Sequence, residues 1–316
     1  MRERHDRSRS HFRFFTCDVF TDRPFTGNPL AVFPDAEGMP DNLMQRIARE
    51  FNLSETTFVL PTRSAQADFQ VRIFTPAQEL PFAGHPTIGT ALVLAWRGSV
   101  KTEEGRGRVV LEEKAGVVPV SIHSVCGLPG YAELAVPAPP VKEQETLPLQ
   151  DVAAALSLSP EEISSGDDCH QIWGCGTSCL CVPVRNLESV GRARPDLGIW
   201  GRVFSGPPLA GAYVFAYGGL GANADVHARF FAPDLGISED PATGAAASAM
   251  GGYLGSRHPD EAGIHQWTIE QGIEMGRPSE VRLRVEKSQG VVSAVWVGGG
   301  AVPMTEGSLD VEALGV

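Results

Sequence analysis

The chain of 316 residues has no apolar run of the roughly 20 residues that a transmembrane helix needs. Its arginine-rich start, residues 1–13, also lacks the apolar core of a signal peptide. Basic residues are in the minority, and at a formal net charge of -12 no basic stripe could neutralise a nucleic-acid backbone. These absences predict no membrane and no nucleic-acid partner. They favour a cytoplasmic enzyme or binding protein with residues 1–13 as a tail.

Cysteine is scarce as well, because six cysteines do not make a disulfide framework in a chain of this length. Four of them cluster beside His170 and suggest a zinc site: Cys169, Cys175, Cys179 and Cys181. The cluster contains no CxxC pair, however, and residues 179–184 are typical of a buried strand in which Cys acts as a small hydrophobe. No glycine-rich phosphate-binding motif precedes a helix either. We therefore predict no metal and no cofactor.

A short motif is present twice. The first copy is PFAGHPTIGTALVLAW, with His85, and the second is EDPATGAAASAMGGYL, with Asp240. In each, a polar residue and a proline precede a threonine, a glycine and a run of small apolar residues, which delivers a functional group to the first turn of a buried helix. A strand with a Glu, a glycine-containing turn and further strands follow both copies in the same order. This repetition indicates an internal duplication.

The length favours two domains, each large enough to bury a core. We predict an α+β fold of two pseudo-symmetric halves, each a curved, mostly antiparallel sheet or barrel around a central helix. The first half is assigned to residues 1–137, with central helix 87–96. The second half is assigned to residues 138–299, with central helix 243–255. The C-terminal tail, residues 300–316, is a candidate addition to the first half.

Polar residues at the ends of these apolar elements are the candidate site. Glu55 lies between an apolar helix and a strand, where we expect partial desolvation to raise the carboxyl pKa. A carboxylate that takes and returns a proton near neutral pH needs such a shift. His85 and Asp240 each head a helix whose N-terminal amides suit an anionic group such as a carboxylate. The alternatives are a cap or a strand-end surface charge for Glu55, and simple capping for His85 and Asp240.

Five motifs in a fixed order resemble the PhzF-like family of phenazine-biosynthesis isomerases, over nearly the whole chain from about Phe14. The motifs are DVFTDRPFTGNPLAV, IAREFNLSETTFVL, RIFTPAQELPFAGHPTIGTA, FFAPDLGISEDPATG and EQGIEMGRPSEV. The resemblance implies a fold like that of diaminopimelate epimerase, a homodimer and no cofactor. It also implies residue roles: Glu55 as the proton-transferring acid and base, His85 and Asp240 as groups that orient the substrate, and Gly84 and Gly244 as backbone contacts.

One position departs from the family pattern DPATGS, because Ala245 stands where the serine would be. A hydroxyl that could bind a substrate carboxylate is missing, although the backbone amide of Ala245 can still donate. The identity of the substrate is therefore less fixed than the proton-transfer machinery.

The resemblance favours a cofactor-independent isomerase that moves a proton on a small conjugated or cyclic carboxylate, like trans-2,3-dihydro-3-hydroxyanthranilate, in a cleft between the halves. One alternative is an epimerase or tautomerase of another small amino or hydroxy acid, and another is a non-catalytic metabolite-binding or scaffold protein. A two-cysteine racemase is disfavoured, because the chain has no cysteine between Cys17 and Cys126.

Overall fold

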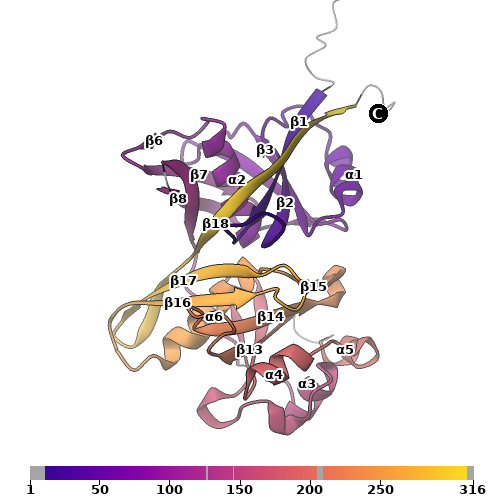
Figure 1. Ribbon diagram of the computed structural model, residues 1–316, viewed down its shortest axis with the longest axis vertical. Helices are drawn as coiled ribbons and strands as arrows, with labels where there is room; N and C mark the ends of the chain where they lie inside the picture. Colours follow the sequence, from indigo (N-terminus) through magenta and orange to yellow (C-terminus); the bar gives the residue numbers. More distant parts are fainter. Residues whose placement is uncertain (1–10, 126, 145, 205–208, 312–316) are drawn as a thin grey trace, which may run out of the picture. The chain divides into compact units, whose positions relative to one another are not determined.

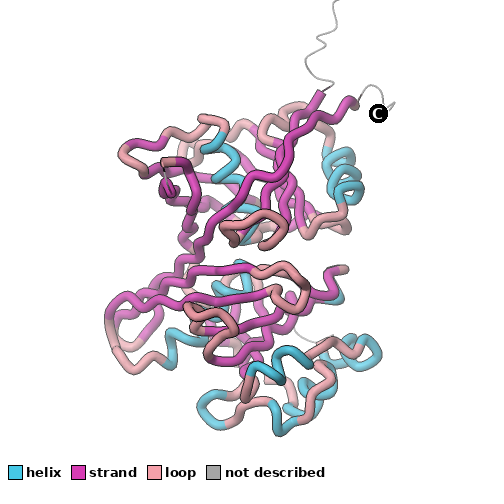
Figure 2. The backbone as a smooth tube through the Cα atoms, in the orientation of Figure 1, coloured by secondary structure: helices cyan, strands magenta, loops and turns pink. Residues whose placement is uncertain are grey.

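The computed structural model describes residues 11–125, 127–144, 146–204 and 209–311 (Figure 1). More of these residues lie in strands than in helices (Figure 2). The predicted tail lies outside the described residues, except that His11 to Arg13 belong to the first strand. The chain divides into two compact units: the first comprises residues up to Pro24, Pro29–Ala132 and the chain from Gly300 on, and the second comprises Phe25–Asn28 and Glu133–Gly299.

The chain up to Ala135 forms, in order, β1 (His11–Val19), β2 (Asn28–Phe33), α1 (Asp41–Phe51), β3 (Glu55–Leu60), β4 (Phe69–Phe74), β5 (Glu79–Leu80), α2 (Gly84–Trp96), β6 (Thr102–Glu103), β7 (Arg106–Glu113), β8 (Gly116–Val125) and β9 (Leu128–Ala135). Strand β2 pairs in parallel with β3, β3 antiparallel with β4, β4 in parallel with β7, and β7 antiparallel with β8. The α1 helix packs on β3 and β4 from the outside (Figure 1). Its buried face contributes to a core cluster that includes Phe33, Phe58 and Phe74.

The remaining elements are β10 (Val141–Lys142), α3 (Leu149–Ala155), β11 (Gln171–Gly174), β12 (Ser178–Pro183), α4 (Leu187–Arg192), α5 (Leu197–Val203), β13 (Leu209–Tyr217), β14 (Val226–Ala232), β15 (Ile237–Asp240), α6 (Gly244–Arg257), β16 (Gly263–Gln271), β17 (Ser279–Ser288) and β18 (Val291–Asp310). Short 3-10 helices lie at Pro160–Glu162, Gly166–Asp168 and Pro233–Leu235. The long strand β18 pairs with β17 over its first part and with β1 over its last part. Its first part therefore belongs to the second unit and its last part to the first unit.

The two units repeat one pattern of strand pairing. In the second unit β12 pairs in parallel with β13, β13 antiparallel with β14, β14 in parallel with β16, and β16 antiparallel with β17. This is the same sequence of parallel and antiparallel partners as β2, β3, β4, β7 and β8. A short strand, β5 or β15, also folds back on its neighbour just before the central helix in each unit. The predicted α+β fold of two pseudo-symmetric halves is therefore confirmed.

Each central helix is surrounded by strands of its own unit. Every residue of α2 from Gly84 to Ala95 is buried, and α6 is buried from Ala246 to Gly255. Both helices are rich in small residues, because neighbouring side chains occupy the space that a larger side chain would need. A Cβ at Gly89 would lie 2.5 Å from Leu30 Cδ2 and 2.7 Å from Val19 Cγ2. The apolar character of these helices on all sides is thus the signature of their enclosure.

The bounds of both central helices differ from the sequence prediction. The α2 helix begins at Gly84 rather than at residue 87, because the amides of a first turn have no intrahelical acceptor and Pro86 is tolerated there. The α6 helix begins at Gly244 and runs to Arg257, two residues past the predicted end. Gly255 lies inside the helix, where its missing Cβ makes room for Val292 and Val285; a Cβ there would lie 2.7 and 2.9 Å from their nearest atoms.

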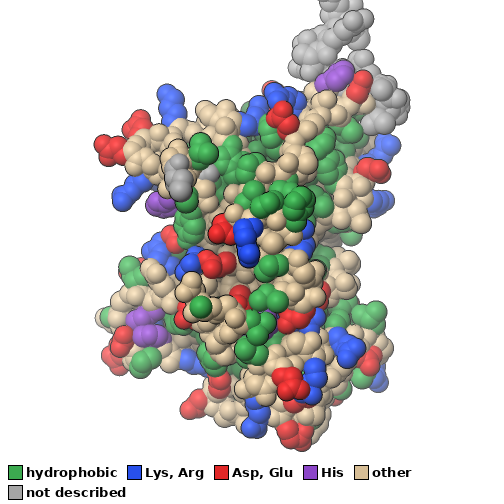
Figure 3. Space-filling view, viewed as in Figure 1, with side chains coloured by type: hydrophobic (Ala, Val, Ile, Leu, Met, Phe, Trp, Pro, Cys, Tyr) green, Lys and Arg blue, Asp and Glu red, His purple; other side chains and the backbone are tan. Residues whose placement is uncertain are grey.

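The surface of each unit carries charges of both signs. On the face shown in Figure 3, Lys and Arg side chains are interspersed with Asp and Glu side chains over the first and the second unit. Within the described residues, no helix has the length and apolar character needed to cross a membrane.

Candidate active site

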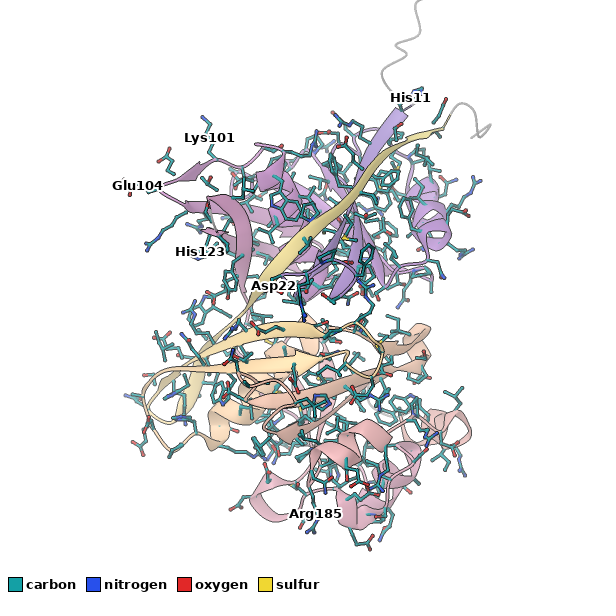
Figure 4. The ribbon with its side chains drawn as sticks, in the orientation of Figure 1. His11, Asp22, Lys101, Glu104, His123 and Arg185 are labelled. Atoms are coloured by element: carbon teal, nitrogen blue, oxygen red, sulfur yellow. The ribbon has the colours of Figure 1, made fainter. Side chains whose placement is uncertain are left out.

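In the first unit the structure brings Glu55 and His85 together. Glu55 is the first residue of β3, beside Leu30 of β2, and His85 is the second residue of α2. The residues are only 7% and 3% exposed, and Glu55 Oε2 lies 3.3 Å from His85 Nε2. The alternative of a strand-end surface charge is therefore wrong for Glu55. By contrast, Lys101, Glu104 and His123 are exposed and point outward from the edge formed by β6 to β8 (Figure 4).

The contact between Glu55 and His85 is not an ion pair at neutral pH. Burial lowers the pKa of His85 to about 3, so its imidazole is neutral over the physiological range. A neutral imidazole has one donor and one acceptor nitrogen. Nε2 can therefore donate to an ionised Glu55 or accept from a protonated one. The pair accommodates both states of the carboxyl group, which a residue that takes up and returns a proton requires.

In the second unit, Asp240 is the last residue of β15, and Asn28 and Thr243 donate to its carboxylate. Asn28 Nδ2 donates to Asp240 Oδ1 at 2.9 Å, and Thr243 Oγ1 donates to Asp240 Oδ2 at 2.6 Å. Asn28 Nδ2 also donates to the carbonyl oxygen of Ala242 at 2.9 Å. Only 5% of Asp240 is exposed. The carboxylate is thus fixed in one orientation within a buried hydrogen-bond network.

Gln271, at the end of β16, supports the same segment. Its Nε2 donates to the carbonyl oxygen of Asp240 at 2.7 Å and to Thr243 Oγ1 at 3.0 Å. Its Oε1 accepts from the backbone amide of Thr243 at 3.2 Å and from the Tyr213 hydroxyl at 2.9 Å. This neutral amide therefore locks the turn that leads from Asp240 into α6.

Neither His85 nor Asp240 is a helix cap. Ala83 occupies the N-cap position of α2 and Thr243 that of α6, and neither side chain makes a capping hydrogen bond. The capping alternative is wrong for both residues, because His85 lies inside the first turn and Asp240 lies before its helix, where it binds side chains. Gly84 and Gly244 are the first residues of their helices, and Ala245 is the second residue of α6. First-turn amides such as theirs lack intrahelical acceptors and suit an anionic group.

One group of described residues has the spacing of metal ligands, and it lies elsewhere. One ligand atom each of His258, Asp260 and His265 come within 4.8 Å of one another. The two imidazole rings lie 3.6 Å apart at 31°, however, and the Asp260 amide donates to His258 Nδ1. This group follows the C-terminal end of α6, about 20 Å along the helix from Gly244 at 1.5 Å per residue. The cysteines of β12 are buried, and the hydrogen bond with Cys179, together with burial, raises the pKa of Cys181 well above its ordinary value.

Sequence reasoning missed several residues that support these groups. Asn28 lies 212 positions from Asp240 in the chain, so no local pattern could link them. Arg229 of β14 donates from Nε and Nη2 to both carboxylate oxygens of Glu239, each at 2.8 Å, and thereby secures the strand that ends in Asp240. Glu113 of β7 is buried against Thr87 of α2, with Thr87 Oγ1 and Glu113 Oε1 2.5 Å apart. The only sequence signal for Glu113 is the repeated strand with a Glu that follows each motif copy.

Known proteins share the sequence pattern and the architecture of this chain. The sequence pattern of the family described as phenazine biosynthesis-like protein, PhzC-PhzF, matches residues 17–307. An uncharacterized isomerase of Mesorhizobium japonicum is 40% identical, over 94% of this chain and 98% of its own. The trans-2,3-dihydro-3-hydroxyanthranilate isomerase of Pseudomonas aeruginosa is 35% identical, over 93% of this chain and 98% of its own. The crystal structure of a Bacillus anthracis PhzF-family protein matches with a TM-score of 0.84 and 27% identity, covering 95% of this chain and 99% of that one.

The fold and these relatives define the protein as an isomerase of the two-halved α+β class. The chain belongs to the PhzC-PhzF, phenazine biosynthesis-like family. The family resemblance inferred from the five motifs is therefore confirmed.

Proposed function

We propose that this isomerase moves a proton on a small conjugated or cyclic carboxylate without a cofactor, using Glu55 first as base and then as acid. The observation that carries the proposal is the buried contact of 3.3 Å between Glu55 and a neutral His85. The Pseudomonas aeruginosa relative is named for its action on trans-2,3-dihydro-3-hydroxyanthranilate, a cyclic carboxylate of this class. We propose a substrate of the same chemical type for this chain.

Glu55 alone can carry the proton through both steps of the isomerisation. The ionised carboxylate removes a proton from one carbon of the substrate, and the electron pair of the broken C–H bond spreads into the conjugated system. Glu55 then returns the proton to a second carbon and is ionised again. During the protonated stage the Glu55 O–H can donate to His85 Nε2, which accepts when the imidazole carries its proton on Nδ1. His85 therefore orients the carboxyl group in both stages.

The second unit supplies groups suited to holding a substrate. Asn28 and Thr243 leave the Asp240 carboxylate oriented and able to accept from a further donor, such as a substrate hydroxyl or amino group. The first-turn amides of Gly244 and Ala245, and that of Gly84 in the first unit, are suited to an anionic oxygen. We propose that these groups orient the substrate while Glu55 carries out the chemistry.

Ala245→Ser tests the anion-binding role of the α6 start. A hydroxyl at this position should lower the KM for a carboxylate substrate about twofold to tenfold with little change in kcat, since one added hydrogen bond contributes about 0.5–1.5 kcal/mol. Steady-state kinetics measure the effect. Ala245→Cys is the matched control, because it adds similar bulk with only a weak donor. Equal KM values for the Ser and Cys variants would remove the α6 start from the substrate site.

We also propose that the protein is a cytoplasmic homodimer. The described cysteines, Cys17 and the four of the second unit, are all free thiols, as suits a reducing compartment. The dimer is proposed from the family resemblance. Multi-angle light scattering of the purified protein should give about twice the single-chain mass of 33.8 kDa. A mass equal to one chain would contradict the dimer.

The experiment that tests the function is a profile of the purified enzyme against a panel of small carboxylates. The panel holds cyclic conjugated acids, including trans-2,3-dihydro-3-hydroxyanthranilate, and acyclic amino and hydroxy acids. Isomerisation of a cyclic conjugated acid supports the proposal. Turnover restricted to amino or hydroxy acids would instead support an epimerase or tautomerase, which the alanine at position 245 favours as the second candidate. Binding without turnover across the panel would indicate a metabolite-binding protein.

A further inference from the structure

Glu113 is a buried carboxyl group that the proposed mechanism does not use. It is the last residue of β7 and only 4% exposed. Its Oε1 lies 2.5 Å from Thr87 Oγ1, and its Oε2 has no hydrogen-bond partner among the described residues. An ionised carboxylate in such a place would be costly, because burial removes the water that stabilises its charge.

The Thr87 hydroxyl lies within hydrogen-bond distance of two oxygens, the Ala83 carbonyl and Glu113 Oε1. Thr87 Oγ1 lies 2.7 Å from the carbonyl oxygen of Ala83, which can only accept. A hydroxyl group has one hydrogen. When Thr87 donates that hydrogen to Ala83, the short contact with Glu113 needs a proton from the carboxyl group. Burial outweighs the opposing effect of the Thr87 hydrogen bond and raises the pKa of Glu113 to about 8, so that proton is present at neutral pH.

The internal duplication gives an independent indication of the same role. Strands β7 and β16 occupy matching places: β7 is parallel to β4 and antiparallel to β8, and β16 is parallel to β14 and antiparallel to β17. In β7 Glu112 pairs with β4, and in β16 Glu270 pairs with β14. The next residues are Glu113 and Gln271. Gln271, a permanently neutral side chain, holds the turn between Asp240 and Thr243.

We propose that Glu113 is a positioning residue of the candidate active site: a neutral carboxyl group that donates to Thr87 and thereby fixes the first turn of α2, which carries Gly84 and His85. Glu113 thus holds the first turn of α2 in place, as Gln271 holds the turn before α6. The proposal deepens the proposed function, on which its kinetic part rests. It acts through Thr87 and His85 and does not itself contact the substrate.

The charged groups near Glu113 are held by other partners or face solvent. Glu112 alternates with it along β7 and accepts from the Thr62 hydroxyl, and Lys114 is exposed. On the neighbouring strand β4, Arg72 is bound by Glu79 and Asp41. On α2, His85 stays neutral at neutral pH because burial lowers its pKa to about 3. Glu55 lies against His85 itself, so a change near pH 8 is assigned to Glu113 where Glu113→Gln removes it.

The direct test is NMR of the histidine side chains in the full-length protein labelled on histidine. His85 is assigned by its absence from the spectrum of His85→Gln. In the wild type, the His85 ring signals should shift with a midpoint near pH 8 as Glu113 ionises. In Glu113→Gln the signals should match those of the wild type at pH 6 and show no such transition, and Glu112→Gln should titrate like the wild type. Absence of the transition from the wild type, or its persistence in Glu113→Gln, would overturn the proposal.

Kinetics and stability give separate readouts. Glu113→Gln should keep wild-type kcat at pH 6 and lose the decline of the wild type above pH 8, whereas Glu113→Ala should lower kcat at least about tenfold through misplacement of His85. Because the folded pKa lies above the ordinary value of 4.5, wild-type stability falls as pH rises towards about 8. The melting temperature of Glu113→Gln minus that of the wild type should therefore increase from pH 5 to pH 9.

The two proposals fail in different ways. If Glu55→Gln retains turnover while the His85 signals follow Glu113, the mechanism fails and the positioning role stands. A constant melting-temperature difference across pH, together with an unchanged alkaline limb in Glu113→Gln, would overturn the neutral carboxyl and leave the mechanism intact.

Discussion

Glu55→Gln is expected to lower kcat at least about a hundredfold, the usual contribution of a general base. The amide is nearly the same size as the carboxyl group but cannot take up a proton from carbon. His85 remains a neutral partner at 3.3 Å from the substituted position, so substrate binding should change little. Steady-state kinetics on the substrate found by the carboxylate panel, with KM compared alongside kcat, measure the effect.

Glu112→Gln is the matched control for that variant. Glu112 is a glutamate of the same unit, half-buried on β7, where it accepts a hydrogen bond from Thr62. It should keep kcat within about twofold of the wild type, because the mechanism gives it no proton to move. Equal losses in both variants would mean that disturbance of the first unit, rather than loss of a base, explains the result.

Arg229→Ala is expected to lower the free energy of unfolding by about 3–5 kcal/mol, the usual cost of leaving one partner of a buried ion pair alone. The Arg229 side chain is 9% exposed and binds both oxygens of Glu239. Its Nη1 also donates to the carbonyl oxygens of Val190, Gly191 and Ala193 at the C-terminal end of α4. The last carbonyls of a helix lack intrahelical donors, although that of Val190 also accepts from the Ala193 amide at 3.2 Å. Removal of the guanidinium therefore withdraws a donor from this helix end and leaves one carboxylate uncompensated. Denaturant unfolding at constant pH measures the loss.

Arg192→Ala provides the comparison for Arg229→Ala. Arg192 pairs with Glu162 and Glu188, but its side chain is 53% exposed. An exposed ion pair contributes about 0–1 kcal/mol, so this variant should unfold close to the wild type. Because Glu239 precedes Asp240 in β15, Arg229→Ala should also impair the Asp240 site. A loss under about 1 kcal/mol for Arg229→Ala would contradict the structural role assigned to it.

The sequence predicted those features of the fold that depend on local pattern. The central helices were recognisable because apolar residues surround them on all sides and because the motif that opens them is repeated. Their ends were less predictable, because they depend on long-range packing. Residue 255 was the predicted end of the second central helix, whereas Gly255 lies inside α6 and the close approach of Val285 and Val292 explains it.

The sequence predicted which residues belong to the candidate site, but it did not predict their burial or their hydrogen-bond partners. Spacing alone left open whether Glu55 was a surface charge, because burial depends on strands and a helix brought together by the whole unit. The partners of Asp240 were also hidden, since Asn28 comes from a segment near the start of the chain. For Glu113, the alternation along β7 could not reveal that its inward side chain meets the hydroxyl of Thr87. Long-range packing, rather than local propensity, decides each of these features.

Hydrogen exchange between substrate and solvent tests the role of Glu55 most directly. The substrate is incubated in deuterium oxide with wild type or Glu55→Gln at matched saturation, and deuterium in substrate and product is followed by NMR. The account predicts that wild-type enzyme moves or exchanges the carbon-bound hydrogen, and that Glu55→Gln binds the substrate yet leaves that hydrogen in place. Exchange at an undiminished rate in Glu55→Gln would contradict it.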